Sequence, residues 1–103
     1  MLELNKSNFE KEIKANKLIV IDLWAEWCGP CKAMGPTFEE LSKEMKNITF
    51  AKLNVDENSN IASELGVMSI PTFLIFKNGK EVGRIIGANP KSSMKSKIES
   101  AIR

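Results

Sequence analysis

The sequence predicts an α/β sandwich, in which helices cover both faces of a mixed β-sheet. Three observations lead to this prediction. Segments with helical and with strand-like apolar patterns follow one another along the chain with short breaks. The segment 18–25, LIVIDLWA, is apolar on both alternating faces, which is typical of a strand buried between two layers. Asn78-Gly79 separates two further strand-like segments and is a strong signal for a two-residue hairpin turn.

The composition predicts one ordinary globular domain. The chain has 103 residues, 43% of them hydrophobic and 27% charged, so we expect residues 1–103 to form a single domain and a monomer. Fifteen Lys and Arg against 13 Asp and Glu give a net charge of +2, which is too small to predict a nucleic-acid partner. The longest apolar runs, 18–21 and 73–76, are far shorter than the ~20 residues of a membrane span. Residues 1–6 lack an export pattern, so a cytoplasmic location is expected.

The first half of the chain predicts helix, strand, helix and strand in that order. Ser7-Asn8-Phe9-Glu10 fits a capping box and predicts a helix over about 7–16. After the strand at 18–25, apolar residues recur at helical spacing: Met34, Phe38, Leu41 and Met45. This spacing continues across Pro36, so we expect one long, kinked helix. Residues 48–55 predict the next strand, and the right-handed crossover rule makes the two strands parallel.

The second half predicts a helix, a hairpin and a closing helix. Residues 58–65 predict a short helix, and Gly66 suits its C-terminal end. The segments 72–77 and 81–86 flank the Asn78-Gly79 turn and predict an antiparallel pair. Asn89-Pro90 predicts an N-cap and a first helical residue. The inner face of the closing helix then consists of Met94, Ile98 and Ile102.

The two cysteines of the chain lie three residues apart, in Cys28-Gly29-Pro30-Cys31, between the buried strand and the long helix. Side chains at this spacing in a helical turn have Cβ atoms ~5–6 Å apart, so the sulfurs can bond after a small adjustment. Closing so short a loop contributes only about 2 kcal/mol in the chain-entropy model. A disulfide between these cysteines would therefore stabilise the fold little, and the pair is better suited to switch between the dithiol and the disulfide form.

The position of each cysteine predicts its role. Cys28 falls where the long helix begins, and unpaired N–H groups and the positive end of the helix dipole favour its thiolate there. Because the thiolate is the attacking species, Cys28 is the expected nucleophile. Cys31 lies further into the helix, is expected to be more buried, and suits the resolving role. Pro30 stiffens the first turn.

Other interpretations of the cysteine pair remain open. Closed zinc and iron–sulfur sites need about four ligands, so a metal carrier would have to pool the cysteines of two chains. A binding module could use the same surface while the redox chemistry is incidental, and the cysteines could also be plain buried residues. The chain has no histidine, which excludes His-based acid–base catalysis.

The motif and its surroundings resemble the thioredoxin family. WCGPCK follows VIDLWA, and SIPT and GA come later in the chain; the resemblance covers essentially all 103 residues. It implies the thioredoxin fold, a three-layer α/β/α sandwich with a central mixed sheet of five strands, including a short one near 2–4, and four helices. It also implies a thiol–disulfide oxidoreductase without a bound cofactor. Such a protein reduces diverse protein disulfides and is re-reduced by a thioredoxin reductase. Gly29-Pro30 between the cysteines resembles the reducing members of the family.

Asp22 interrupts the apolar strand at 18–25. A buried acid there would have a raised pKa, whereas an acid at a strand end could still reach solvent. The family resemblance implies that Asp22 accepts and returns the proton of Cys31, through water. It also implies that Lys52 lies near this acid, although a solvated strand lysine fits the residues equally well.

The resemblance implies a docking surface beside the cysteines. Pro71 matches the cis-proline of the family, which exposes the backbone of Ile70 to pair with an extended substrate segment. Gly87 leaves room for close backbone approach, although Gly87-Ala88 could also be a plain turn. The residues expected to form this surface are Trp27, Ser69, Ile70, Pro71, Gly87 and Ala88.

Overall fold

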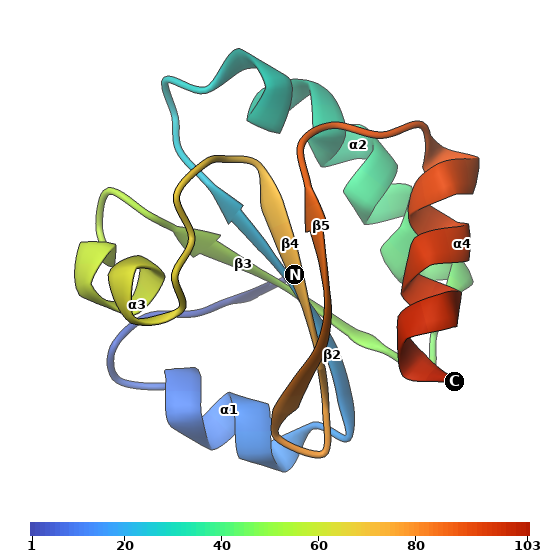
Figure 1. Cartoon of the computed structure of the whole chain (residues 1–103), viewed down its shortest axis with the longest axis horizontal. Coiled ribbons are helices and arrows are strands. Elements are labelled where there is room, and N and C mark those ends of the chain that lie inside the picture. The colour runs from blue at the N-terminus through green and yellow to red at the C-terminus, as the bar shows by residue number, and fades with distance from the viewer.

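The computed structural model describes all 103 residues and contains a five-stranded sheet in the order β1-β3-β2-β4-β5 (Figure 1). The strands are β1 (Leu2–Glu3), β2 (Leu18–Trp24), β3 (Thr49–Asn54), β4 (Thr72–Lys77) and β5 (Lys80–Ile86). The helices are α1 (Phe9–Ala15), α2 (Gly29–Glu44), α3 (Ser59–Glu64) and α4 (Lys91–Ile102). β1, β3 and β2 are parallel, whereas β4 pairs antiparallel with β2 and β5. The predicted mixed sheet of five strands with four helices is confirmed.

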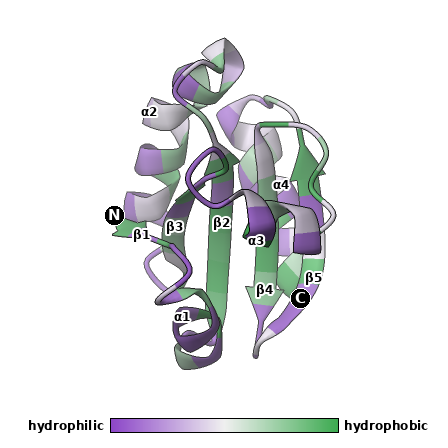
Figure 2. Cartoon of the chain, turned by 90° about the vertical axis from the view of Figure 1, so that its left-hand side faces the viewer, coloured by the Kyte–Doolittle hydropathy of each residue, from purple (hydrophilic) through white to green (hydrophobic).

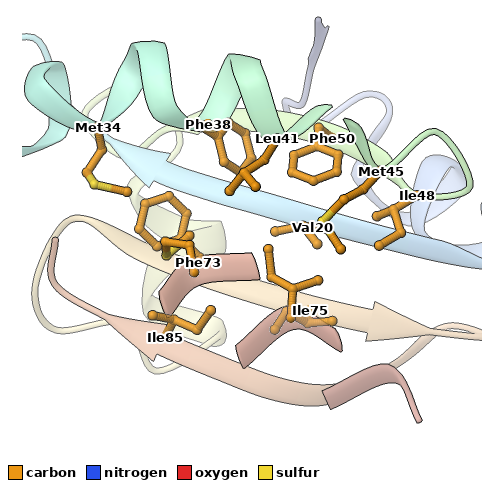
Figure 3. Close-up of a cluster of buried hydrophobic side chains, with 12 residues drawn as sticks. Val20, Met34, Phe38, Leu41, Met45, Ile48, Phe50, Phe73, Ile75 and Ile85 are labelled. Carbon is orange, nitrogen blue, oxygen red and sulfur yellow. The ribbon is translucent and has the colours of Figure 1, made fainter. Parts of the chain in front are cut away.

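The central strand β2 is buried by a layer of helices on each face. One apolar cluster lies under α2 and α4 and contains Val20 of β2 together with Phe38 and Ile98 (Figure 3). The other lies under α1 and α3 and contains Ile19 and Ile21. Figure 2 shows the apolar strands β2 and β4 between the helices. Alternate residues of β2 therefore enter different clusters, as its uninterrupted apolar sequence predicts.

Two further predictions are confirmed by the backbone. α2 runs as one helix through Pro36, and buried side chains on both sides of the proline pack it against the sheet. Asn78 and Gly79 have φ angles of 53° and 82°, the left-handed values that the tight turn between β4 and β5 requires. Asn and Gly tolerate these angles, so the turn sets the pairing of Lys77 with Lys80; the register shifts further on, between Ile75 and Phe76.

The predicted starts of two helices are wrong. α1 begins at Phe9, and no Ser7 capping box forms; instead Asn5 and Asn8 each accept, through the side-chain oxygen, the backbone N–H of the other, at 3.2 and 2.7 Å. α4 begins at Lys91, with Pro90 as its extended N-cap. The Asn89 side chain does not cap the helix: its oxygen accepts from the Lys97 ammonium at 3.1 Å, and its amide donates to the Gly87 carbonyl at 3.3 Å. None of the helices has the length and apolar composition to cross a bilayer.

β5 and α4 approach each other closely at Gly83. A Cβ atom added there would lie 2.7 Å from the Cβ of Ala101. We therefore expect Gly83→Ala to lower the free energy of unfolding by about 1–3 kcal/mol, because the two elements must move apart. Chemical denaturation measures this change. In the double variant, Ala101→Gly should recover part of the loss, giving a non-additive cycle.

A matched glycine provides the control for this prediction. Gly35 lies inside α2, and a Cβ added there would meet no atom within 4 Å. Gly35→Ala should therefore raise the free energy of unfolding by about 0.5–1 kcal/mol through helix propensity. Equal effects of the two Gly→Ala changes would contradict the close approach at Gly83.

Candidate active site

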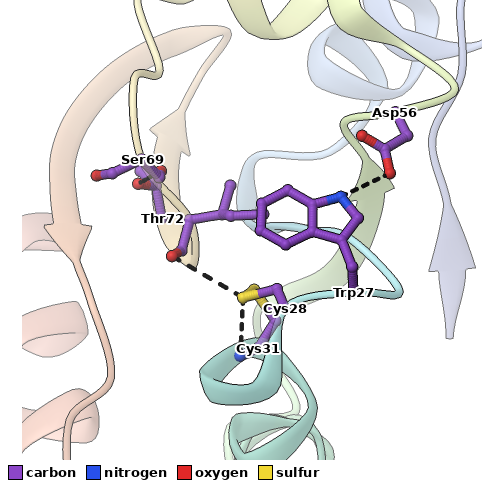
Figure 4. Close-up of a disulfide and its surroundings, with 7 residues drawn as sticks. Trp27, Cys28, Cys31, Asp56, Ser69 and Thr72 are labelled. Atoms are coloured by element: carbon purple, nitrogen blue, oxygen red, sulfur yellow. Dashed lines mark hydrogen bonds between the residues drawn. A yellow bond between two sulfur atoms is a disulfide. The ribbon is translucent and has the colours of Figure 1, made fainter.

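Cys28 and Cys31 form a disulfide at the start of α2 (Figure 4). Their Cα atoms are 5.3 Å apart, within the usual range for a disulfide, so the helical spacing needs little backbone change to close the bond. Cys28 is the N-cap of α2 in an extended conformation, and Pro30 occupies the first turn, where a missing N–H costs no helical hydrogen bond. A side chain at Gly29 would meet no atom within 4 Å.

The Cys28 sulfur accepts a hydrogen bond at the helix N-terminus. The backbone N–H of Cys31 donates to it at 3.2 Å, as an N-terminal N–H does to an N-cap side chain. The same N–H and the positive end of the α2 dipole would stabilise negative charge on this sulfur after reduction. This position therefore favours the thiolate form of Cys28.

Burial does not distinguish the two cysteines in the disulfide form, so the greater burial of Cys31 stays a prediction. The exposed fractions of Cys28 and Cys31 are 4% and 3%, because the bond ties both sulfurs into the same small cluster with Ala25. The sulfurs differ in their neighbours instead. The Cys28 sulfur lies 4.0 Å from the carbonyl oxygen of Ile70 and is the one that receives the N–H of Cys31.

Asp22 is buried in the middle of the sheet, so the solvent-exposed alternative is excluded. Its exposed fraction is 1%, and neither carboxylate oxygen has a hydrogen-bond partner. Burial raises the pKa of Asp22 to about 7, and the charge of Lys52 lowers the pKa in part. No hydrogen bond joins Asp22 to either cysteine. The acid is thus poised between its two protonation states near neutral pH.

Lys52 lies beside Asp22, as the family resemblance implied. The two residues are direct partners in the parallel register of β3 and β2. The Lys52 ammonium does not form an ion pair with the carboxylate and instead lies 4.5 Å from the centre of the Trp24 ring. Its influence on Asp22 is therefore an attraction at a distance, which favours the charged form of the acid.

The structure brings Pro71 and Gly87 together next to the disulfide. The Ile70–Pro71 peptide bond is cis, as the resemblance implied, and the Gly87 N–H donates to the Pro71 carbonyl at 2.8 Å. Gly87 has a φ of 87°, so this turn requires the conformational freedom of glycine. The hydroxyl of Thr72 donates to the Ser69 carbonyl at 2.7 Å. Ala88 follows Gly87 and is exposed.

Trp27 is the most prominent exposed aromatic residue of the site, with 71% of its surface accessible. Its indole N–H donates to the Asp56 carboxylate at 2.9 Å (Figure 4). Beside it lies an open cavity of about 290 Å³. The lining residues are Trp27, Val55, Ala62, Val67, Met68, Ser69 and Ile70.

Sequence reasoning missed Asp56 and three apolar residues of this cavity: Val55, Ala62 and Val67. A signal was present for Val55 and Asp56, because both directly follow β3. β3 is parallel to β2, so the carboxyl ends of the two strands, and the residues after them, meet at one edge of the sheet. No comparable local signal marks Ala62 and Val67. A larger cavity, of about 600 Å³, lies between α1 and α3 and contains neither cysteine.

Comparison with known proteins gives consistent results. The thioredoxin family model matches residues 1–100. The chain is 40% identical over 103 residues to a thioredoxin of Alicyclobacillus acidocaldarius, covering 99% of this chain and 98% of the relative. It is 46% identical over 102 residues to a thioredoxin of Chlorobaculum thiosulfatiphilum, covering 97% and 94%. A solved structure of Plasmodium falciparum thioredoxin superposes with a TM-score of 0.91 at 39% identity, covering 97% and 98%.

The unpaired burial of Asp22 predicts a pH-dependent stability. Between the unfolded pKa of 3.8 and the folded value of about 7, the folded state holds a proton that the unfolded state has lost. The free energy of unfolding therefore falls as pH rises through this window, by about 1.4 kcal/mol per unit at most. Urea titrations of the oxidised protein at several pH values measure this slope.

The Asp22→Asn variant tests whether Asp22 causes this pH dependence of the free energy of unfolding. The amide does not ionise, so the contribution of this position should vanish, and at pH 8 the variant should exceed the wild type by about 2 kcal/mol, after the cost of an unpaired buried amide. Well below pH 3.8, where Asp22 is protonated in both states, no gain is expected. A variant that is less stable than the wild type at pH 8 would contradict the assignment.

Proposed function

This chain belongs to the thioredoxin family, and we propose that Cys28 is the nucleophile and Cys31 the resolving cysteine of its reaction. The chain is a thiol–disulfide oxidoreductase that reduces protein disulfides by dithiol/disulfide exchange and is re-reduced by a thioredoxin reductase. The observation that carries the assignment of roles is the position of the Cys28 sulfur, which is the N-cap atom of α2 and accepts the N–H of Cys31.

The reaction proceeds by two exchanges at sulfur. The Cys28 thiolate attacks one sulfur of the target disulfide; the target S–S bond breaks, and its other sulfur leaves as a thiolate. Cys31 then loses its proton and attacks the Cys28 sulfur, which breaks the mixed disulfide and releases the second target thiolate. Two electrons have passed to the target, and the Cys28–Cys31 disulfide remains, in the geometry of this structure.

Asp22 supplies the proton transfer that the second exchange needs. A pKa of about 7 lets the acid accept a proton and return it near neutral pH. Because no direct hydrogen bond joins Asp22 to Cys31, water carries the proton between them. Lys52 modulates this acid, since its charge keeps the pKa of Asp22 from rising further with burial.

Protein substrates dock on the surface next to the Cys28 sulfur. The Ile70 backbone, whose carbonyl faces this sulfur, pairs with an extended segment of the target, a mode that recognises backbone rather than sequence. Gly29 leaves open space beside Cys28, and Pro30 keeps the first turn of α2 rigid. The residues that form the docking surface are Trp27, Ser69, Ile70, Pro71, Gly87 and Ala88.

Three broader assignments belong to the same proposal. Residues 1–103 act as one domain, which is supported by the single sheet with helices on both faces and by the family match over residues 1–100. The protein works as a monomer, since its reaction needs the two cysteines of one chain. It carries electrons in the cytoplasm, where a reducing environment keeps a dithiol available.

Trapping the intermediate tests the two cysteine roles. Reduced Cys31→Ser protein should form a stable mixed disulfide with a protein disulfide such as that of insulin, because the resolving thiol is missing. Cys28→Ser, the matched control, should form little. Mass spectrometry after acid quenching measures the adduct and the attached residue. An adduct of equal yield in both variants would reverse or remove the division of roles.

Asp22→Asn tests the proton transfer. The first exchange does not depend on this acid, so the rate of mixed-disulfide formation should change little. The second exchange should slow about tenfold or more near pH 7, because general base assistance to Cys31 is lost. Rapid-quench kinetics separates the two steps. Equal slowing of both steps would show that Asp22 acts on Cys28 instead.

A further inference from the structure

We propose that Arg84 is a positioning residue for protein substrates, whose guanidinium holds the segment 66–70 so that Ser69 and Ile70 lie ready to dock a target. The segment joins α3 to β4. Arg84 itself lies on β5, away from the disulfide, and acts through this segment. The inference rests on the proposed function, because it concerns how a target reaches Cys28.

The Arg84 guanidinium connects the edge strand to the end of α3. It donates to the Leu65 carbonyl at 2.7 Å and to the Gly66 carbonyl at 3.2 Å. Its other side donates to both carboxylate oxygens of Glu81, at 2.9 and 3.0 Å. Such paired hydrogen bonds from a charged, planar group fix orientation as well as distance. Glu81 thus aims Arg84 at the two carbonyls.

The carbonyls of Leu65 and Gly66 lie at the C-terminal end of α3. No further N–H group of the helix can donate to them there. Gly66 has a φ of 68°, and the Val67 N–H returns to the Ala62 carbonyl at 3.0 Å, which ends the helix. The carbonyls of Leu65 and Gly66 point beyond this closed turn, and the turn's own N–H groups are already engaged with α3. Arg84 supplies the donors that they lack.

Apolar packing also anchors this end of the segment, because Leu65 and Val67 lie against the cluster that contains Ile19 and Ile21. α3 has six residues, of which Ile61 and Ala62 are buried. Figure 2 shows the helix in front of β4 and β5, at the edge of the sheet. At the far end of the segment, the Thr72 hydroxyl holds the Ser69 carbonyl at 2.7 Å. Between these two anchors, Met68 is exposed. Arg84 is the side chain that hydrogen-bonds this end, so releasing its contacts loosens the segment there while the Val67 N–H and the apolar packing still hold it.

The expected effect depends on the kind of disulfide that is reduced. A protein segment pairs with the Ile70 backbone, so a looser segment must be ordered on binding, and this cost weakens docking. A small disulfide reagent needs the Cys28 thiolate and makes no backbone pairing. Loss of Arg84 should therefore weaken the use of protein disulfides and spare the small reagent.

The test compares Arg84→Met with Lys91→Met. Lys91 forms exposed ion pairs with Glu40, at 2.9 Å, and with Glu44 between α2 and α4, so its loss removes the same charge from the other layer. With insulin as substrate, Arg84→Met should raise KM about fivefold, which corresponds to roughly 1 kcal/mol, and change kcat less than about twofold. Its rate with the small disulfide dithiobis-nitrobenzoate should stay at the wild-type value. Lys91→Met should match the wild type in both assays.

Arg84→Lys keeps the charge but cannot reach both carbonyls while pairing with Glu81, so its KM should lie between the other values. This variant also carries the test if Arg84→Met is not folded at the assay temperature. An unchanged KM in an active Arg84 variant would overturn the inference and leave the proposed function intact. A parallel fall with the small reagent would also overturn it. A wild-type protein that reduces neither substrate would overturn the proposed function itself.

Discussion

The burial of β2 on both faces is the constraint on which the rest of the structure depends. Its residues enter two separate apolar clusters, one under each helical layer, and this fixes the strand in the centre of the sheet. The chain leaves the strand at Trp24 and begins α2 a few residues later, with Cys28 as the N-cap. The packing of the core therefore places the start of this loop, and the contact of the Cys28 N–H with the Ala25 carbonyl then helps to fix the reactive sulfur.

The same burial creates the chemistry of Asp22. A carboxyl group in this strand has no hydrogen-bond partner, and its removal from water raises its pKa to about 7. An acid with that pKa lowers the free energy of unfolding near neutral pH, since its ionised form is disfavoured in the folded state. It suits proton exchange with a thiol. In the proposed function, the core thus gives up stability at one position to hold an acid that can carry a proton.

Local sequence signals predicted the parts of the fold that depend on local physics. The apolar run of β2, the Asn78-Gly79 turn and the helical spacing across Pro36 all correspond to elements of the structure. The N-caps of α1 and α4 were missed because the side-chain oxygen of Asn5 accepts from the Asn8 backbone and that of Asn89 accepts from the Lys97 ammonium. Which of these hydrogen bonds forms depends on the tertiary structure, and the sequence pattern alone does not predict it.

The residues of the site also fall into those that local sequence signals predict and those that only the tertiary structure brings together. The cysteine pair and Asp22 were predictable because each breaks a strong local pattern at a place where burial or a helix start gives it a chemical consequence. The equal burial of the two cysteines was not, since it follows from the bond between them. The cavity beside Trp27 was also missed, because its walls come from the end of β3, from α3 and from the segment before β4. These parts meet only in the folded chain.

The two halves of the site are also held by different forces, and this bears on how one protein can serve many targets. The sulfurs sit on a helix start fixed by the core, where the chemistry must not vary. The docking segment combines apolar packing of Val67 and Ile70 with a few polar contacts: Thr72 to Ser69, Gly87 to Pro71, and Arg84 to the end of α3. Polar anchors at an exposed edge hold the backbone in place while leaving Met68 and its neighbours free to fit different side chains. A rigid reactive centre beside an adaptable backbone platform is what the reduction of unrelated protein disulfides requires.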